Sequence, residues 1–157
     1  MLSLARIIAT VGGAGYLPKA PGTAGALVGT IILIAWTQFT GHAHMTAYNL
    51  TIGLASLLFF ILGVWSANVL EPEWGKDPGK IVVDELVGVW IAGMFVTPTL
   101  LHLLLAFVLF RIFDIWKPLG IRHFEKYKGG LGVMLDDVVA GIYACIVLQV
   151  IVYFFNI

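Results

Sequence analysis

The class of this protein is decided by one run of sequence, ALVGTIILIAWTQFTGHAHMTAYNLTIGLASLLFFILGVWSANVL, which occupies positions 26–70. The run contains no Asp, Glu, Lys or Arg, and the charge-free stretch reaches back to residue 20. An α-helix needs about 20 mostly apolar residues to cross the hydrocarbon core of a bilayer. We therefore predict two membrane-spanning helices here, at 24–40 and 46–70, separated by a polar turn.

The composition of the whole chain agrees with this interpretation. Of its 157 residues, 60% are apolar and 11% are charged, whereas soluble domains have about 45–50% and about 25%. We predict an all-α, polytopic membrane helical bundle that forms one domain over residues 1–157. Nine basic residues balance nine acidic ones, which argues against a basic face for nucleic acid. The single cysteine, Cys145, excludes an intrachain disulfide.

Three further spans are expected in the second half of the chain. Pro98 interrupts the apolar part of segment 79–116, and proline disfavours helix at and before its own position. We therefore predict two passes of about 18 residues that meet at 97–99, near the lower limit for a span. A last span is expected at 133–155, which brings the total to five.

The charged residues are concentrated in two islands, 71–85 and 111–137, which hold all the charges except Arg6 and Lys19. The joints between the other spans carry no Lys or Arg. Because positively charged loops stay in the cytoplasm, the N-terminus and both islands are predicted to be cytoplasmic. The islands are thus expected on one side of the membrane.

Six carboxylates within the islands are candidates for chemistry: Asp77, Asp84, Glu85, Asp114, Asp136 and Asp137. If the third helix begins near Pro78, Asp84 and Glu85 lie almost two turns inside it. Asp136 and Asp137 are expected about one turn inside the last helix. Ionised carboxylates at such depth are costly unless they are paired or bind a cation. Salt bridges that anchor helix ends are the alternative explanation.

Oxygen ligands of this kind suit Mg²⁺, which binds one or two carboxylates together with waters and phosphate oxygens. Adjacent residues on a helix point about 100° apart, so one member of each pair can reach a metal while the other supports it. Nearby, Arg111, Asp114 and Lys117 follow i, i+3, i+6 spacing. The two cations could hold a phosphate, or all three could form simple salt bridges.

A backbone site for an anion is predicted where the first long span begins. Pro21 and Gly22 suggest a turn, and Thr23 is expected to be the N-cap of the helix. Free N–H groups at a helix start attract phosphate. The four histidines show no metal-ligand spacing, and we assign them no role.

Four blocks carry a resemblance to a known family: PGTAG at 21–25, DPGKIVVDE at 77–85, FRIFDIWKP at 110–118 and GGLGVMLDD at 129–137. With these blocks in this order, the chain resembles the phosphatidylglycerophosphatase A family of bacterial membrane lipid phosphatases. One departure is Gly120, where the family usually has a second proline after Lys-Pro.

The resemblance implies Mg²⁺-dependent removal of the terminal phosphate of phosphatidylglycerophosphate, giving phosphatidylglycerol, in the bacterial inner membrane with the active site facing the cytoplasm. The metal ligands it implies are Asp77, Asp84, Glu85, Asp136 and Asp137. The catalytic residues are expected to be Asp84, Arg111, Asp114 and Lys117. Substrate is expected to contact Thr23, Lys80, Arg111 and Lys117.

Two other classes of protein are considered. An ion-coupled transporter subunit could use the acids as a cation site, although its acids would lie near the bilayer midplane and its sequence would carry an inverted repeat. A CDP-alcohol phosphotransferase would carry Asp-x-x-Asp-Gly, which is missing from the chain.

Overall fold

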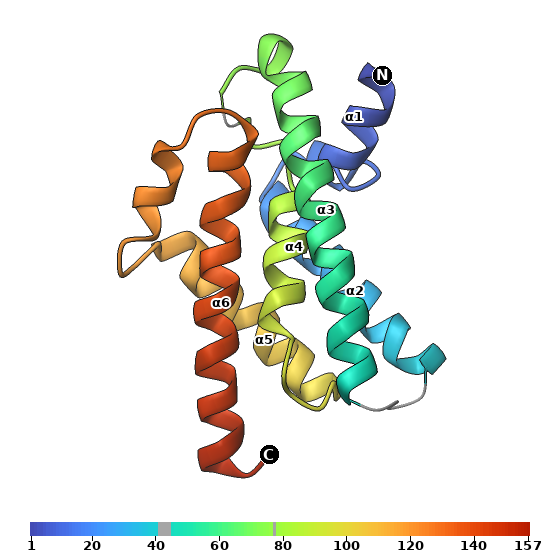
Figure 1. Cartoon of the computed structure of the whole chain (residues 1–157), viewed down its shortest axis with the longest axis vertical. Helices are drawn as coiled ribbons and strands as arrows, with labels where there is room; N and C mark the ends of the chain where they lie inside the picture. Colours follow the sequence, from blue (N-terminus) through green and yellow to red (C-terminus); the bar gives the residue numbers. More distant parts are fainter. Residues whose placement is uncertain (41–44, 77) are drawn as a thin grey trace.

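The computed structural model describes residues 1–40, 45–76 and 78–157. The described part of the chain consists of helices joined by turns and loops, with no strand (Figure 1). Its elements are α1 (Leu2–Ala9), η1 (Ala14–Tyr16), α2 (Pro21–Thr40), α3 (Met45–Trp74), α4 (Val83–Ala92), α5 (Leu100–Trp116), η2 (Ile121–Lys126) and α6 (Gly130–Phe155). The predicted all-α class is confirmed.

Two of the helices, α3 and α6, are long and apolar enough to cross a membrane by length and composition. On α3, Leu54, Leu57 and Leu58 are all more than half exposed. An apolar surface of this extent is unusual for a soluble monomer and suits contact with lipid.

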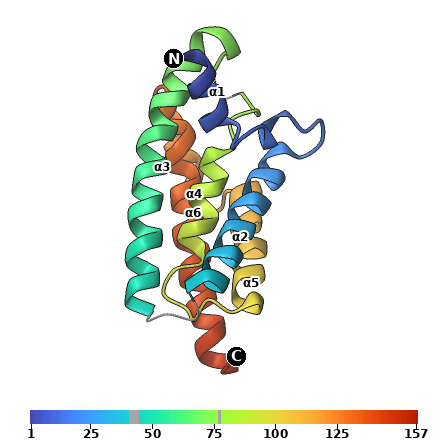
Figure 2. The ribbon, with the colours of Figure 1, turned by 90° about the vertical axis from the view of Figure 1, so that its right-hand side faces the viewer.

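Helix α4 is the centre of the bundle. Figures 1 and 2 show it enclosed by α3 and α6 on one side and by α2 and α5 on the other. Eight of its ten residues are buried, and the indole Nε1 of Trp90 donates a hydrogen bond to the carbonyl of Gly29 on α2 at 3.0 Å. Because neighbours cover it on every side, α4 is apolar around its whole circumference except at its start.

The start of α4 corrects one prediction. The helix begins at Val83, five residues after Pro78, so Asp84 and Glu85 lie in its first turn and not two turns inside. The reason is a contact between distant segments: the N–H of Val82 donates to the carbonyl of Ala9 at 2.8 Å, which holds the preceding residues outside the helix. The two acids are nevertheless recessed, because α4 begins well below the end of α3 (Figure 1).

The end of α4 also differs from expectation. The break at 97–99 is confirmed, since α5 begins at Leu100 and Thr99 caps it by accepting the N–H of His102 at 3.2 Å. However, α4 already ends at Ala92, so it has ten residues where about 18 were predicted. Ten residues rise about 15 Å, roughly half the apolar thickness of a bilayer. The first of the two passes predicted in segment 79–116 is therefore longer than the helix that forms there.

Two other helix starts were predicted incorrectly. Helix α2 begins at Pro21, a position that proline favours because it has no N–H to lose, so Thr23 lies within the first turn and is not the N-cap. Helix α6 begins at Gly130, which places Asp136 and Asp137 nearly two turns inside it where one turn was expected.

Glycine at position 25 allows α2 to lie directly on the start of α4. A Cβ added to Gly25 would lie 2.6 Å from both the Cβ and the carbonyl oxygen of Val82. We expect Gly25→Ala to lower the free energy of unfolding by about 1–3 kcal/mol, as overpacking does in a tight core. Thermal unfolding in detergent would measure this. Gly79→Ala, whose Cβ meets nothing within 4 Å, is the control and should leave the midpoint unchanged.

Candidate active site

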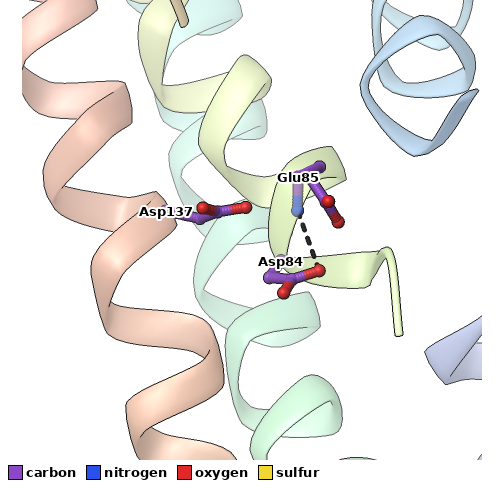
Figure 3. A group of neighbouring side chains, drawn as sticks. All are labelled: Asp84, Glu85 and Asp137. Atoms are coloured by element: carbon purple, nitrogen blue, oxygen red, sulfur yellow. Dashed lines mark hydrogen bonds between the residues drawn. The ribbon is translucent and has the colours of Figure 1, made fainter. Parts of the chain in front are cut away.

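Three carboxyl groups converge where α4 begins. Asp84 and Glu85 come from the first turn of α4 and Asp137 comes from α6, and each offers an oxygen within 4.8 Å of the others. Figure 3 shows the Asp137 side chain directed from α6 toward α4. An oxygen of Asp84 also accepts the backbone N–H of Glu85 at 3.1 Å, which fixes its orientation. We call these three residues the acid triad.

Two glycines bring the helices of the acid triad together. Gly88 lies one turn after Asp84, and Gly141 lies one turn after Asp137. A Cβ on Gly141 would be 2.5 Å from the carbonyl oxygen of Gly88, and a Cβ on Gly88 would be 2.9 Å from that of Asp137. The backbones of α4 and α6 are thus in direct contact at this point, which sets the distance between the carboxyls one turn earlier.

Two cations border the acid triad. Arg111 on α5 forms an ion pair with Asp114 and reaches Glu85, with 3.9 Å between Nη1 and Oε1. Lys117 is the C-cap of α5 in a left-handed conformation, with φ of 45°. It therefore leaves the helix axis, and its Nζ lies 2.5 Å from Oδ2 of Asp136.

The adjacent acids on α6 are divided between two tasks. Asp137 joins the acid triad, whereas Asp136 pairs with Lys117. This is the division expected from the angle between neighbouring residues on a helix. On α4, by contrast, the adjacent residues Asp84 and Glu85 both belong to the acid triad. Glu85 lies near Asp137 and also near Arg111.

The site carries more negative charge than its own cations balance. Among the described residues, five carboxyls, from the acid triad, Asp114 and Asp136, lie together with two cations, Arg111 and Lys117. The three Asp side chains on α4 and α6 belong to residues that are 8% exposed or less. Oε2 of Glu85 is buried and has no hydrogen-bond partner among the described residues. Buried, uncompensated carboxylates require protons or a cation, so the acid triad fits a divalent metal with oxygen ligands.

The start of α2 closes one side of the site. A Cβ on Gly22 would lie 2.0 Å from Oε1 of Glu85 and 3.3 Å from Nη1 of Arg111. A side chain at this position would push the Glu85 carboxyl away from its present place beside Arg111. Thr23 follows in the same helical turn, close to the site although not in the capping role that was predicted.

Apart from Thr23, the predicted site residues fall into three groups by position. The Nζ of Lys80 lies over the ring of Trp74 at the end of α3, 5.6 Å from its centroid. Asp77 lies outside the described residues. Those that the fold does bring together are Asp84, Glu85, Arg111, Asp114, Lys117, Asp136 and Asp137.

A cavity of about 640 Å³, which no sequence pattern indicated, opens beside Asp136. It lies between the end of α3, the segment before α4 and the start of α6, where Oδ1 of Asn68 accepts the N–H of Gly130 at 2.7 Å. Asn68 belongs to the charge-free run, and nothing in its sequence surroundings distinguishes it. Its role depends on a partner 62 residues away.

Comparison with known proteins assigns this arrangement to a family. The family model of phosphatidylglycerophosphatase A matches residues 7–152, nearly the whole chain. The chain belongs to the phosphatidylglycerophosphatase A family. The match spans α2 to α6 and therefore every residue of the site described above.

Three relatives of the chain are similar to it over most of their length. The chain is 39% identical to a phosphatidylglycerophosphatase A of Haemophilus influenzae, over 98% of this chain and 91% of that protein. It is 36% identical to one of Escherichia coli, over 83% and 73%. A Bacteroides thetaiotaomicron protein, provisionally named a phosphatidylinositol-3-phosphatase, is 48% identical over 92% and 91%. No solved structure matches the chain.

These relationships confirm the family that the four sequence blocks indicated, and they confirm that the protein is a phosphatase. They give no support to the alternative of an ion-coupled transporter.

Proposed function

We propose that the protein removes the terminal phosphate of phosphatidylglycerophosphate in a Mg²⁺-dependent reaction. The observation that carries the proposal is the buried acid triad beside Arg111 in a chain of this family. Asp84, Glu85 and Asp137 would hold the metal. When bound, Mg²⁺ neutralises phosphate charge and lowers the pKa of an attacking water.

The protein's own cations would act on the phosphoryl group. Arg111 is within reach of Glu85, and its guanidinium can donate two parallel hydrogen bonds to phosphate oxygens. Asp114 holds Arg111 through its ion pair, which favours a positioning role for this acid. Lys117 is held by Asp136 at the edge of the cavity and supplies a second positive charge. Both cations would stabilise the charge that spreads over the phosphoryl oxygens in the transition state.

The proposal includes a multi-pass topology with the site at the cytoplasmic end. The chain termini lie at opposite ends of the molecule (Figure 1). No Lys or Arg occurs in the joints at 40–45 and 93–99 or after residue 128, so the opposite end lacks the positive charge that marks cytoplasmic loops. A phosphatase site at the cytoplasmic interface would meet lipid headgroups on that leaflet.

The test is phosphate release by the detergent-purified protein. We expect rapid release from phosphatidylglycerophosphate with Mg²⁺ and a loss of more than roughly 100-fold with excess chelator, since a catalytic metal contributes several kcal/mol. Phosphatidic acid serves as the comparison lipid. A folded protein that releases no phosphate from phosphatidylglycerophosphate would contradict the proposal.

One relative favours a second substrate. The Bacteroides protein, at 48% identity, carries the provisional name of a phosphatidylinositol-3-phosphatase. Phosphatidylinositol 3-phosphate therefore belongs in the same assay. If phosphate is released faster from phosphatidylinositol 3-phosphate than from phosphatidylglycerophosphate, phosphatidylinositol 3-phosphate becomes the proposed substrate.

A further inference from the structure

We propose that the cavity beside Asp136 is a subsite for a second anionic group of the lipid headgroup, the phosphodiester that remains on the lipid after hydrolysis. The inference rests on the proposed function and adds a specificity determinant to it. Both candidate substrates carry a phosphodiester in addition to the phosphomonoester that is removed, whereas phosphatidic acid carries only the monoester.

Positive charge lines the cavity. Lys76, Lys126 and Lys128 contribute to its wall, and all three are exposed. Among the described residues, none of these ammonium groups takes part in an ion pair. Within the described ranges of the chain, the acids of the lining are Glu71 and Asp136, and Asp136 already pairs with Lys117. The wall therefore has positive charge available for an incoming anion.

The backbone adds to this positive potential. Helix α6 begins at the cavity with Gly129 as its N-cap and without an acid in its own first turn, and the N–H of Gly130 is already bound by Oδ1 of Asn68. The positive end of the helix dipole thus faces the cavity, where Glu71 is the neighbouring carboxylate. Glycine is required at this point, since a Cβ on Gly130 would be 2.4 Å from the carbonyl oxygen of Val64.

The position of the cavity relates it to the site. Asp136 lines the cavity and holds Lys117, while the next residue, Asp137, belongs to the acid triad. The cavity therefore borders the site at one residue, Asp136. Its volume of about 640 Å³ lies within the range of small-molecule sites, about 300–1,000 Å³. A headgroup with its terminal phosphate near Arg111 would have its next polar group beside these lysines.

The experiment uses two probes that separate the cavity from the acid triad. Short-chain phosphatidylglycerol carries the phosphodiester and no monoester, and inorganic phosphate resembles the group that is removed. We compare wild type with the triple variant Lys76→Gln, Lys126→Gln, Lys128→Gln. Binding of phosphatidylglycerol is measured by calorimetry in detergent, and phosphate is measured as an inhibitor of phosphatase activity.

We expect the triple variant to bind phosphatidylglycerol roughly 10–100-fold more weakly, because it loses charge-assisted contacts, and to show a similarly raised KM for phosphatidylglycerophosphate. Its kcat and its inhibition by phosphate should be unchanged. Arg122→Gln is the matched control. It removes an exposed positive charge from η2, the element that contains Lys126, but Arg122 does not line the cavity.

Three outcomes are decisive. Unchanged affinity for phosphatidylglycerol in the triple variant would overturn the subsite. An equal loss of affinity for phosphatidylglycerol and for phosphate would also overturn it, and so would the same loss of affinity in Arg122→Gln. In either case the lysines would act only through the overall positive potential of the surface. Lysine-dependent binding of phosphatidylglycerol by a wild type that hydrolyses no phosphatidylglycerophosphate would support the subsite and contradict the proposed function.

Discussion

Replacing Asp137 by Asn is expected to lower kcat by more than roughly 100-fold, beyond the loss seen when only a supporting group of a metal site is removed. Asn keeps the shape of the side chain but removes one charged oxygen of the acid triad. The residue is 3% exposed, so the variant removes a charged ligand from a site with little access to bulk solvent. Phosphate release with saturating Mg²⁺ would measure the change.

The same variant should remain folded. The charges of Asp114, Glu85 and Asp136 all act on Asp137, so neutralising it relieves repulsion when no metal is bound. Thermal unfolding therefore provides a second measurement: Mg²⁺ should raise the midpoint of the wild type by linkage and should raise that of Asp137→Asn much less.

Glu73→Gln is the control for both measurements. Glu73 is an exposed acid that pairs with Arg6 at 2.6 Å and contributes nothing to the acid triad. It should retain wild-type turnover and the full response to Mg²⁺. If Asp137→Asn retained both as well, the assignment of the acid triad to a metal would be wrong.

The second large effect is expected from Gly88→Ala, which changes no functional group. Its Cβ would lie 2.3 Å from the Phe110 ring and 2.9 Å from the carbonyl oxygen of Asp137, so α4 and α6 must separate. A displacement of about 1 Å at a catalytic site can cost roughly 100-fold in rate. We expect kcat to fall by this order, with a loss of about 1–3 kcal/mol in the free energy of unfolding.

Two further variants separate displacement of the helices from general instability. Gly53→Ala places a Cβ at 3.4 Å from the mobile end of Met94, which is ordinary contact, and should leave activity unchanged. Adding Phe110→Leu to Gly88→Ala removes part of the obstructing ring and should recover part of the rate. Wild-type kcat in Gly88→Ala itself would show that the contact between α4 and α6 does not set the geometry of the site.

Much of the site could be predicted from sequence because its signals are local. Charge is costly in an apolar helix, so the acids at 84–85 and 136–137 stand out against long charge-free runs. The i, i+3 spacing of Arg111 and Asp114 predicts neighbours on one helical face, and these two residues do form an ion pair. The four blocks indicated the family in the same way, since each is a short contiguous pattern.

By itself, then, the sequence determined the helical class, the apolar character, the family and most of the charged residues at the site. Only the tertiary structure decided where α4 begins, because the Val82–Ala9 hydrogen bond joins segments that no local pattern relates. It also decided that Lys117 pairs with Asp136 and that three lysines from both charged islands line one cavity. Hydropathy and charge are properties of neighbouring residues, whereas these contacts depend on how closely glycine-lined helices approach, which is settled only when the whole bundle packs.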